Sequence, residues 1–184
     1  MIFIYEGPDN VGKSTQIQYL KDYIEKDLQQ TAHVMHYSNI KGRNLESRSK
    51  EYYNEMFGIS KFASNNDINL ILDRAHGGET VYSPIYRGYA GDYVYDLEKS
   101  YNGKVLNNMI LIVFIDDDEN LVDREDGESF SNDPTIKKQE IANFIKFYEN
   151  SNIKKKLLIN IKDKSKEVVW EEIKNYLERE WLQK

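Results

Sequence analysis

Residues 7–14 read G-P-D-N-V-G-K-S and complete the pattern G-x-x-x-x-G-K-[ST] of a phosphate-binding loop. The pattern follows Met1–Tyr5, a short apolar run of β-branched and aromatic residues that is typical of a buried strand. Apolar residues then recur at helical spacing, at Ile17, Leu20, Ile24 and Leu28. In the order strand, loop, helix, backbone N–H groups and the helix N-terminus can hold phosphate oxygens. The sequence therefore predicts a nucleoside triphosphate site.

The loop supplies the first candidate site residues. The predicted nucleotide contacts are Gly7, Pro8, Asp9, Asn10, Val11, Gly12, Lys13, Ser14 and Thr15. Lys13 is expected to reach the β- and γ-phosphates of ATP, and Ser14 to hold Mg²⁺. ATP and Mg²⁺ are thus the expected cofactors.

Composition narrows the class of partner. The formal net charge of −6 argues against nucleic acid as the main partner. The absence of cysteine excludes disulfides, thiolate metal sites and thiol nucleophiles. No apolar run reaches the roughly 18 residues of a membrane span, and a loop at residue 7 leaves no room for a signal peptide. We expect a soluble, cytoplasmic protein that binds small molecules, contacts no membrane, and forms one domain over residues 1–184.

The distribution of apolar runs predicts the fold class. Four further strands are expected at Ala32–Tyr37, Ile68–Leu72, Met109–Ile115 and Lys156–Ile161. Helical patterns follow at Thr135–Tyr148 and Ser165–Leu182, and Ser165 is a candidate N-cap. Strands that alternate with helices indicate an α/β protein with a five-stranded parallel sheet between helical layers, the three-layer P-loop NTPase fold. Residues 116–134 are acidic and have no strong period, which is typical of a surface segment.

A second motif lies at the end of the third predicted strand. Asp73 and Arg74 come at the carboxyl edge of the sheet, where ligands bind in open α/β sheets. Asp73 can organise Mg²⁺, and Arg74 can take an anionic phosphate with two parallel hydrogen bonds. Further candidate substrate contacts follow at Glu79, Tyr82, Ser83 and Arg87. Downstream of the loop the GTPase patterns D-x-x-G and N-K-x-D do not occur, so this element favours a small-molecule acceptor.

With these motifs the chain resembles the thymidylate kinases, which are nucleoside monophosphate kinases. The segment Glu6–Gln16 reads E-G-P-D-N-V-G-K-S-T-Q, close to the family's E-G-x-D-x-x-G-K-S-T-Q. Asp73-Arg74 with Tyr82 eight residues past the arginine is similar to the family's D-R-Y segment and its tyrosine. Residues 116–134 fall where the family has its lid, and Phe144 and Tyr148 match an F-x-x-x-Y pattern. His76–Glu79 resembles viral members of the family.

The resemblance implies an activity and roles. The activity is transfer of the γ-phosphate of ATP to a pyrimidine deoxynucleoside monophosphate by a homodimer. Asp9 would contact the sugar 3′-OH or the magnesium shell, and Arg74 would bind the acceptor monophosphate. Tyr82 would sit against C2′ and favour deoxyribose.

Several positions depart from the family pattern. Ala75 replaces the third residue of D-R-Y, and Tyr37-Ser38-Asn39 replaces an R-E-P-G-like turn that carries a phosphate-binding arginine. Asn10 stands where some members place a catalytic arginine, so Arg124 of the lid is the candidate for that role. Arg43 or Arg48 could supply the acceptor arginine, and Tyr53 or Phe57 the ring that stacks on the base.

These departures leave two alternative functions and the choice of base open. A deoxynucleoside kinase would need a base early in the fold and have less use for Arg74. A nucleotide-binding regulatory protein would have lost turnover. Thymine, uracil and modified pyrimidines all fit the acceptor that the sequence predicts.

Overall fold

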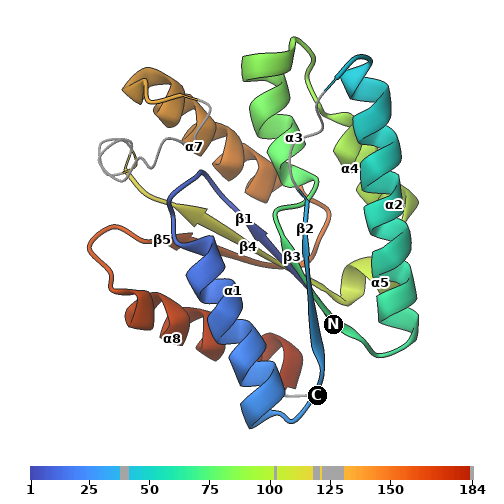
Figure 1. Ribbon diagram of the computed structural model, residues 1–184, viewed down its shortest axis with the longest axis vertical. Coiled ribbons are helices and arrows are strands. Elements are labelled where there is room, and N and C mark those ends of the chain that lie inside the picture. Colours follow the sequence, from blue (N-terminus) through green and yellow to red (C-terminus); the bar gives the residue numbers. More distant parts are fainter. Residues whose placement is uncertain (38–41, 102, 118–120, 122–130, 183–184) are drawn as a thin grey trace.

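Five parallel strands form a single sheet in the order β2-β3-β1-β4-β5 (Figure 1). The fold is seen in a computed structural model that describes residues 1–37, 42–101, 103–117, 121 and 131–182. The strands are β1 (Ile2–Glu6), β2 (Ala32–His36), β3 (Asn69–Asp73), β4 (Met109–Ile115) and β5 (Lys155–Asn160). Each predicted strand is present, and no strand end differs from its prediction by more than one residue. The predicted fold class is confirmed.

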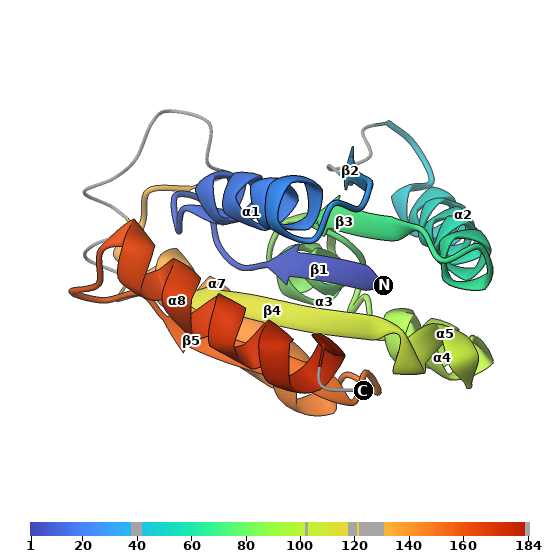
Figure 2. The same ribbon diagram turned by 90° about the horizontal axis from the view of Figure 1, so that it is seen from below.

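Helices cover both faces of the sheet (Figures 1 and 2). One face carries α1 (Lys13–Asp22), which continues into the π-helical turn η1 (Tyr23–Asp27), and α8 (Lys166–Leu177), which continues into η3 (Glu178–Leu182). The other face carries α2 (Leu45–Asn65), α3 (Gly77–Tyr82) with its π-helical extension η2 (Ser83–Arg87), α4 (Tyr93–Ser100), α5 (Lys104–Asn107) and α7 (Pro134–Asn150). Ser165 caps α8 as expected, because its hydroxyl accepts a hydrogen bond from the Val168 amide at 3.3 Å.

The two faces bury separate hydrophobic clusters. Along β1, Ile2 and Ile4 join the cluster beneath α2, α3 and α7, whereas Phe3 and Tyr5 join the one beneath α1 and α8. This alternation follows from the two-residue period of a strand. Because β1 and β4 lie inside the sheet with both faces covered, their sequences are nearly continuous apolar runs, and Glu6 at the end of β1 is the one charged residue among them.

The parallel register brings the loops of interest to one edge. Tyr5 of β1 pairs with Asp73 of β3, and Glu6 pairs with Val113 of β4. The segments that follow these strands therefore start side by side, although they are far apart in sequence. In the part of the chain that the structure describes, no helix combines the length and apolarity needed to cross a membrane.

Candidate active site

The phosphate loop connects β1 to α1, and its glycines are required by its geometry. Gly7 has φ of +143°, and a Cβ added there would lie 2.5 Å from the carbonyl oxygen of Phe114 in β4. Gly12, the N-cap of α1, adopts a left-handed φ of +76°. Asn10 is also left-handed, with φ of +64°, a conformation that asparagine tolerates better than most residues. The loop thus turns sharply into the N-terminus of α1.

Lys13 is folded back over the loop. Its side chain is only 6% exposed, and its ammonium donates hydrogen bonds to the carbonyl oxygens of Gly7, at 2.9 Å, and Pro8. Burial, followed by the nearby positive charge of Arg74, lowers the pKa of Lys13 to about 7. If a phosphate binds here as predicted, it would draw this ammonium away from the loop carbonyls, and its negative charge would favour the charged form.

Ser14 and Thr15 are exposed in the first turn of α1. Ser14 is the second residue of α1, directly after Lys13, and its predicted role is to hold Mg²⁺. Asp73, the other predicted Mg²⁺ ligand, accepts a hydrogen bond from Nδ1 of His36 at 2.9 Å through one of its carboxylate oxygens. A hydroxyl and a carboxylate are hard oxygen donors of the kind Mg²⁺ uses together with substrate phosphates, so these residues fit the ion.

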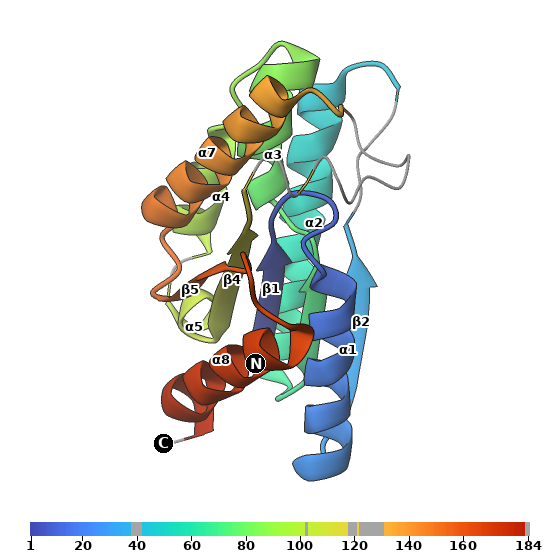
Figure 3. The ribbon, with the colours of Figure 1, turned by 90° about the vertical axis from the view of Figure 1, so that its left-hand side faces the viewer.

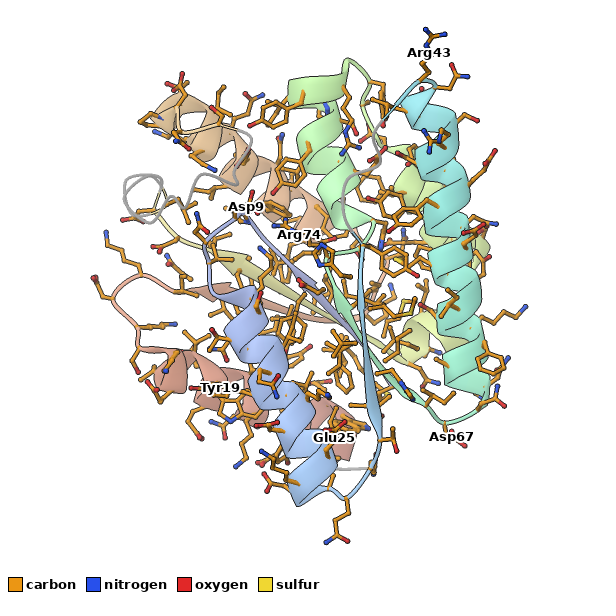
Figure 4. All side chains as sticks on the ribbon, viewed as in Figure 1. Asp9, Tyr19, Glu25, Arg43, Asp67 and Arg74 are labelled. Carbon is orange, nitrogen blue, oxygen red and sulfur yellow. The ribbon has the colours of Figure 1, made fainter. Side chains whose placement is uncertain are left out.

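Arg74 follows β3 directly and turns back over the phosphate loop. Its φ of +64° is left-handed, and its amide donates to the carbonyl of Tyr5 at 3.0 Å. This turn brings the guanidinium into an ion pair with the carboxylate of Asp9 (Figure 4). Three predicted residues, Asp9, Lys13 and Arg74, are thereby brought together from two loops.

Glu6 is a site-building residue that we did not predict. It ends β1 and is fully buried, and one carboxylate oxygen accepts hydrogen bonds from the amides of Ala75, at 3.0 Å, and Gly78, at 3.2 Å. Burial raises the pKa of Glu6. The carboxylate holds the turn that starts α3 against the phosphate loop, so it fixes the position of Arg74. The sequence offers two signals for Glu6, an acid at the end of an apolar strand and the first position of the matched segment Glu6–Gln16, but neither indicates this role.

The substrate contacts predicted on α3 and η2 are occupied in two ways in the empty protein: Tyr82 packs against α7, and Glu79 pairs with Arg87. Tyr82 is nearly buried, and its ring packs edge-on against Phe144 of α7 with centroids 5.8 Å apart. Glu79 is fully buried and accepts hydrogen bonds from Arg87, at 2.6 Å, and from the hydroxyls of Tyr89 and Tyr93. Glu79 and Arg87 therefore neutralise each other. Ser83 is also fully buried.

Arg87 and Tyr89 also line a cavity of about 480 Å³ between η2 and the start of α2. On the α2 side the cavity is lined by Gly42, Asn44, Leu45, Glu46 and Ser47. A second cavity, of about 180 Å³, lies beside the phosphate loop. Its walls are loop residues, the first turn of α1, and Ile161, Lys164, Lys166 and Val169 around the start of α8.

Helix α7 contributes two buried charges that no motif indicated. Lys137 is 1% exposed, with its ammonium 3.6 Å from Oε2 of Glu140, which is equally buried. The other oxygen of Glu140 accepts a hydrogen bond from the hydroxyl of Tyr86 at 2.7 Å. In sequence both residues look like ordinary polar positions of a surface helix.

Of the remaining candidates, those that the structure describes lie away from the loop. Arg124 and residues 118–120 and 122–130 of the predicted lid lie outside the residues that the structure describes. Arg43 is exposed and lies far from Asp9 and Arg74 (Figure 4). Arg48 is exposed on α2. Phe57 is fully buried, with its ring against those of His76, at 4.9 Å, and Tyr101, at 5.1 Å. It packs as a core residue, and Tyr53 is nearly as buried.

Comparisons with known proteins show the fold. Profiles of protein families give no match, and neither do curated protein sequences. Among solved structures, YorR from Bacillus subtilis, in complex with phosphorylated GDP, superposes with a TM-score of 0.65 at 15% identity, over 100% of this chain and 99% of its own. Thymidylate kinase from Candida albicans superposes with a TM-score of 0.61 at 12% identity, over 97% of this chain and 91% of its own. The chain has the α/β fold of these P-loop proteins.

Proposed function

We propose that this chain is a nucleoside monophosphate kinase of the thymidylate kinase type, formed by one domain over residues 1–184. It would transfer the γ-phosphate of ATP to a pyrimidine deoxynucleoside monophosphate. The observation that carries this proposal is the position of Arg74. A second cation, outside the phosphate loop, faces the loop across Asp9. A phosphate loop by itself does not distinguish a kinase from a nucleoside triphosphatase. A guanidinium at this position, in contrast, suits an acceptor that already carries a phosphate group.

On the donor side, the loop amides and Lys13 hold the phosphates of ATP, and Lys13 offsets the negative charge that moves onto the bridging oxygen. Ser14 and Asp73 would hold Mg²⁺, which neutralises charge on the β- and γ-phosphates when bound. The cavity of about 180 Å³ beside the loop is the place for the base of ATP. Catalysis then consists of positioning and charge neutralisation, without a covalent intermediate.

On the acceptor side, the phosphate replaces Asp9 as the partner of Arg74 and accepts two parallel hydrogen bonds from the guanidinium. Asp9 is released toward the sugar or the ion. Tyr82 fills the space that a 2′-OH would need, which selects deoxyribose. The similarity in fold to a thymidylate kinase supports this assignment, and the matching D-R motif at positions 73–74 supports it further.

One observation favours a second candidate, a deoxynucleoside kinase. Asp73 accepts a hydrogen bond from Nδ1 of His36 at the end of β2, which leaves Nε2 able to take a proton from a hydroxyl acceptor. The His36 side chain is half exposed, as such a role requires.

A coupled assay of ADP release separates these candidates. Nucleosides and their 5′-monophosphates would be compared as acceptors, with thymine, uracil and guanine as bases. The guanine arm is included because YorR was solved with a phosphorylated guanine nucleotide. The expected result is turnover with dTMP or dUMP and little turnover with thymidine. Thymidine used as well as dTMP would favour the nucleoside kinase. ATP binding without turnover on any acceptor would favour a regulatory protein.

We further propose that two copies of the chain associate through α2. The outward face of this helix exposes Phe62, which is 62% accessible, with Ile59 one turn before it. Large apolar side chains that neighbour each other on a helix face support an interface role.

A further inference from the structure

Lys137 occupies a position on α7 that the fold would ordinarily give to an apolar residue. The buried residues of this helix are Lys137, Glu140, Phe144 and Phe147, which form one stripe at helical spacing. Phe144 on this stripe contacts Tyr82 of α3, and α3 and α7 lie side by side in two views (Figures 1 and 3). Lys137 therefore points toward the same side as Phe144, two turns closer to the start of α7.

The ion pair that Lys137 makes is incomplete. Its ammonium lies 3.6 Å from Oε2 of Glu140, which is longer than a hydrogen bond. Among the residues that the structure describes, Oε2 of Glu140 has no hydrogen-bond partner, and Glu140 is the only charged group paired with Lys137. A lysine is rarely buried this fully unless it is well paired. A buried ion pair with imperfect geometry contributes little to stability, so the pair calls for another explanation.

The pair also lies next to the acceptor side of the site. Glu140 accepts a hydrogen bond from Tyr86, which is one turn beyond Tyr82. Burial raises the pKa of Glu140, and the negative charge of Asp9 raises it further. Asp9 is the partner of Arg74. Arg74 and Lys137 are thus each paired with one carboxylate, and the two carboxylates lie close enough for their charges to interact.

We propose that Lys137 is a second phosphate-binding residue for the acceptor, and that Glu140 and Tyr86 position it. This inference rests on the proposed function. A phosphate monoester carries nearly two negative charges at neutral pH. Arg74 supplies one countercharge, and Lys137 supplies the other, with Glu140 holding the ammonium in place while the site is empty. Lys137 would thereby replace the phosphate-binding arginine that the resemblance implies after β2 and that this sequence lacks.

The test compares binding of a nucleoside with binding of its monophosphate, because only the monophosphate can use Lys137. Isothermal titration calorimetry would give the dissociation constants of thymidine, dTMP and a non-hydrolysable ATP analogue for the wild-type protein and for Lys137→Met. Lys138→Met is the matched control, since Lys138 is the exposed neighbour on the same helix. Lys137→Arg keeps the charge and should retain part of the preference for dTMP.

The expected result is that Lys137→Met weakens dTMP binding by about 10- to 100-fold, the effect of one charge-assisted hydrogen bond, and leaves thymidine binding unchanged. Methionine fills the space of the lysine stem but leaves the buried carboxylate of Glu140 without its counter-ion, so the thermal midpoint should fall in either case, and the ratio of dTMP to thymidine affinity carries the test. A lower midpoint with an unchanged ratio of dTMP to thymidine affinity would make Lys137 purely structural and overturn the inference. Weaker binding of the ATP analogue alone would place Lys137 on the donor side and also overturn it. A wild-type protein that binds thymidine as tightly as dTMP would instead refute the proposed acceptor class.

Discussion

At the scale of single residues, the site is built from charges that neutralise each other across loops. Asp9 holds Arg74, Glu79 holds Arg87, and the ammonium of Lys13 rests on backbone carbonyls. Each charged group therefore has a role in the empty protein as well as the proposed role with substrate. Substitutions at these positions change both the stability of the empty protein and its binding of ligands, and the two effects have to be measured separately.

Lys13→Ala tests the donor site. Removing the ammonium should lower kcat by at least about 10²–10³-fold, the effect of losing one group that stabilises the transition state. The fold should survive, as judged by circular dichroism and the thermal midpoint. A folded variant with near wild-type turnover would contradict the assignment of the loop.

Lys13→Met tests the lowered pKa of Lys13. In the folded, ligand-free protein this pKa is about 7, against an ordinary value of 10.5 for the unfolded chain. Between these pH values the unfolded chain binds more protons than the native state, so the free energy of unfolding gains a term that rises with pH. The wild type should become more stable relative to Lys13→Met from pH 7 to pH 10, as measured by urea unfolding. A difference that does not change with pH would show that Lys13 stays charged in the empty protein.

Arg74→Lys tests the acceptor site. A point charge cannot make the two parallel hydrogen bonds of a guanidinium, so the loss in kcat/KM for dTMP should be about 2–4 kcal/mol, or about 30- to 1000-fold. Affinity for the ATP analogue should change little. If dTMP is used equally well by the variant, the acceptor phosphate lies elsewhere.

At the scale of elements, α3 depends on close approach between its first turn and two other segments. A Cβ added to Gly77 would lie 2.4 Å from the ring of Phe147 in α7 and 2.8 Å from a carboxylate oxygen of Glu6. The packing of α3 against α7 and the hydrogen bonds from Glu6 to the turn meet at this glycine. The position of α3, and with it that of Tyr82, is therefore set by a residue without a side chain.

Gly77→Ala should destabilise the protein by about 1–3 kcal/mol, the usual cost of overpacking a core. Because the strain falls on the turn after Arg74, the KM for dTMP should rise as well. Gly58→Ala is the control, since Gly58 is exposed within α2 and a Cβ there meets nothing within 4 Å. That variant should be more stable by about 0.5–1 kcal/mol, because alanine is the better helix former. Equal midpoints for the two variants in thermal unfolding would contradict this account of α3.

At the scale of the whole molecule, the sheet and the phosphate loop were predictable because their signals are local. Apolar runs mark strands, and spaced glycines mark the loop. The roles of Glu6 and Glu140 were not predictable, since their hydrogen bonds reach elements distant in sequence, and the burial of Lys137 was not predictable, since it depends on how α7 packs. Which side of α7 faces α3 is decided by packing and is not visible in the sequence. A lysine on that side is therefore expected to be a surface residue. Phe57 shows the converse, because its ring fills the core although the sequence allowed it to stack on a base.

Phe62→Glu tests the association of two copies. A charge on the exposed apolar face of α2 should shift the protein to a monomer in light scattering coupled to size-exclusion chromatography, with little change in thermal midpoint. Lys61→Glu changes the charge of an exposed neighbour by two units and serves as the control. A wild-type protein that is monomeric at about 100 μM, well above the dissociation constant of a stable dimer, would rule out this interface.

The ion pair between Asp9 and Arg74 sets a threshold for what can occupy the proposed acceptor position. A ligand has to offer the guanidinium more than the carboxylate already provides, so weakly charged or singly charged anions gain little by binding. A dianionic phosphate that a nucleoside places correctly can exceed this threshold. If Arg74 binds the acceptor as proposed, the empty protein resists singly charged inorganic anions such as chloride, whereas a nucleoside monophosphate brings a second charge together with the contacts of its sugar and base.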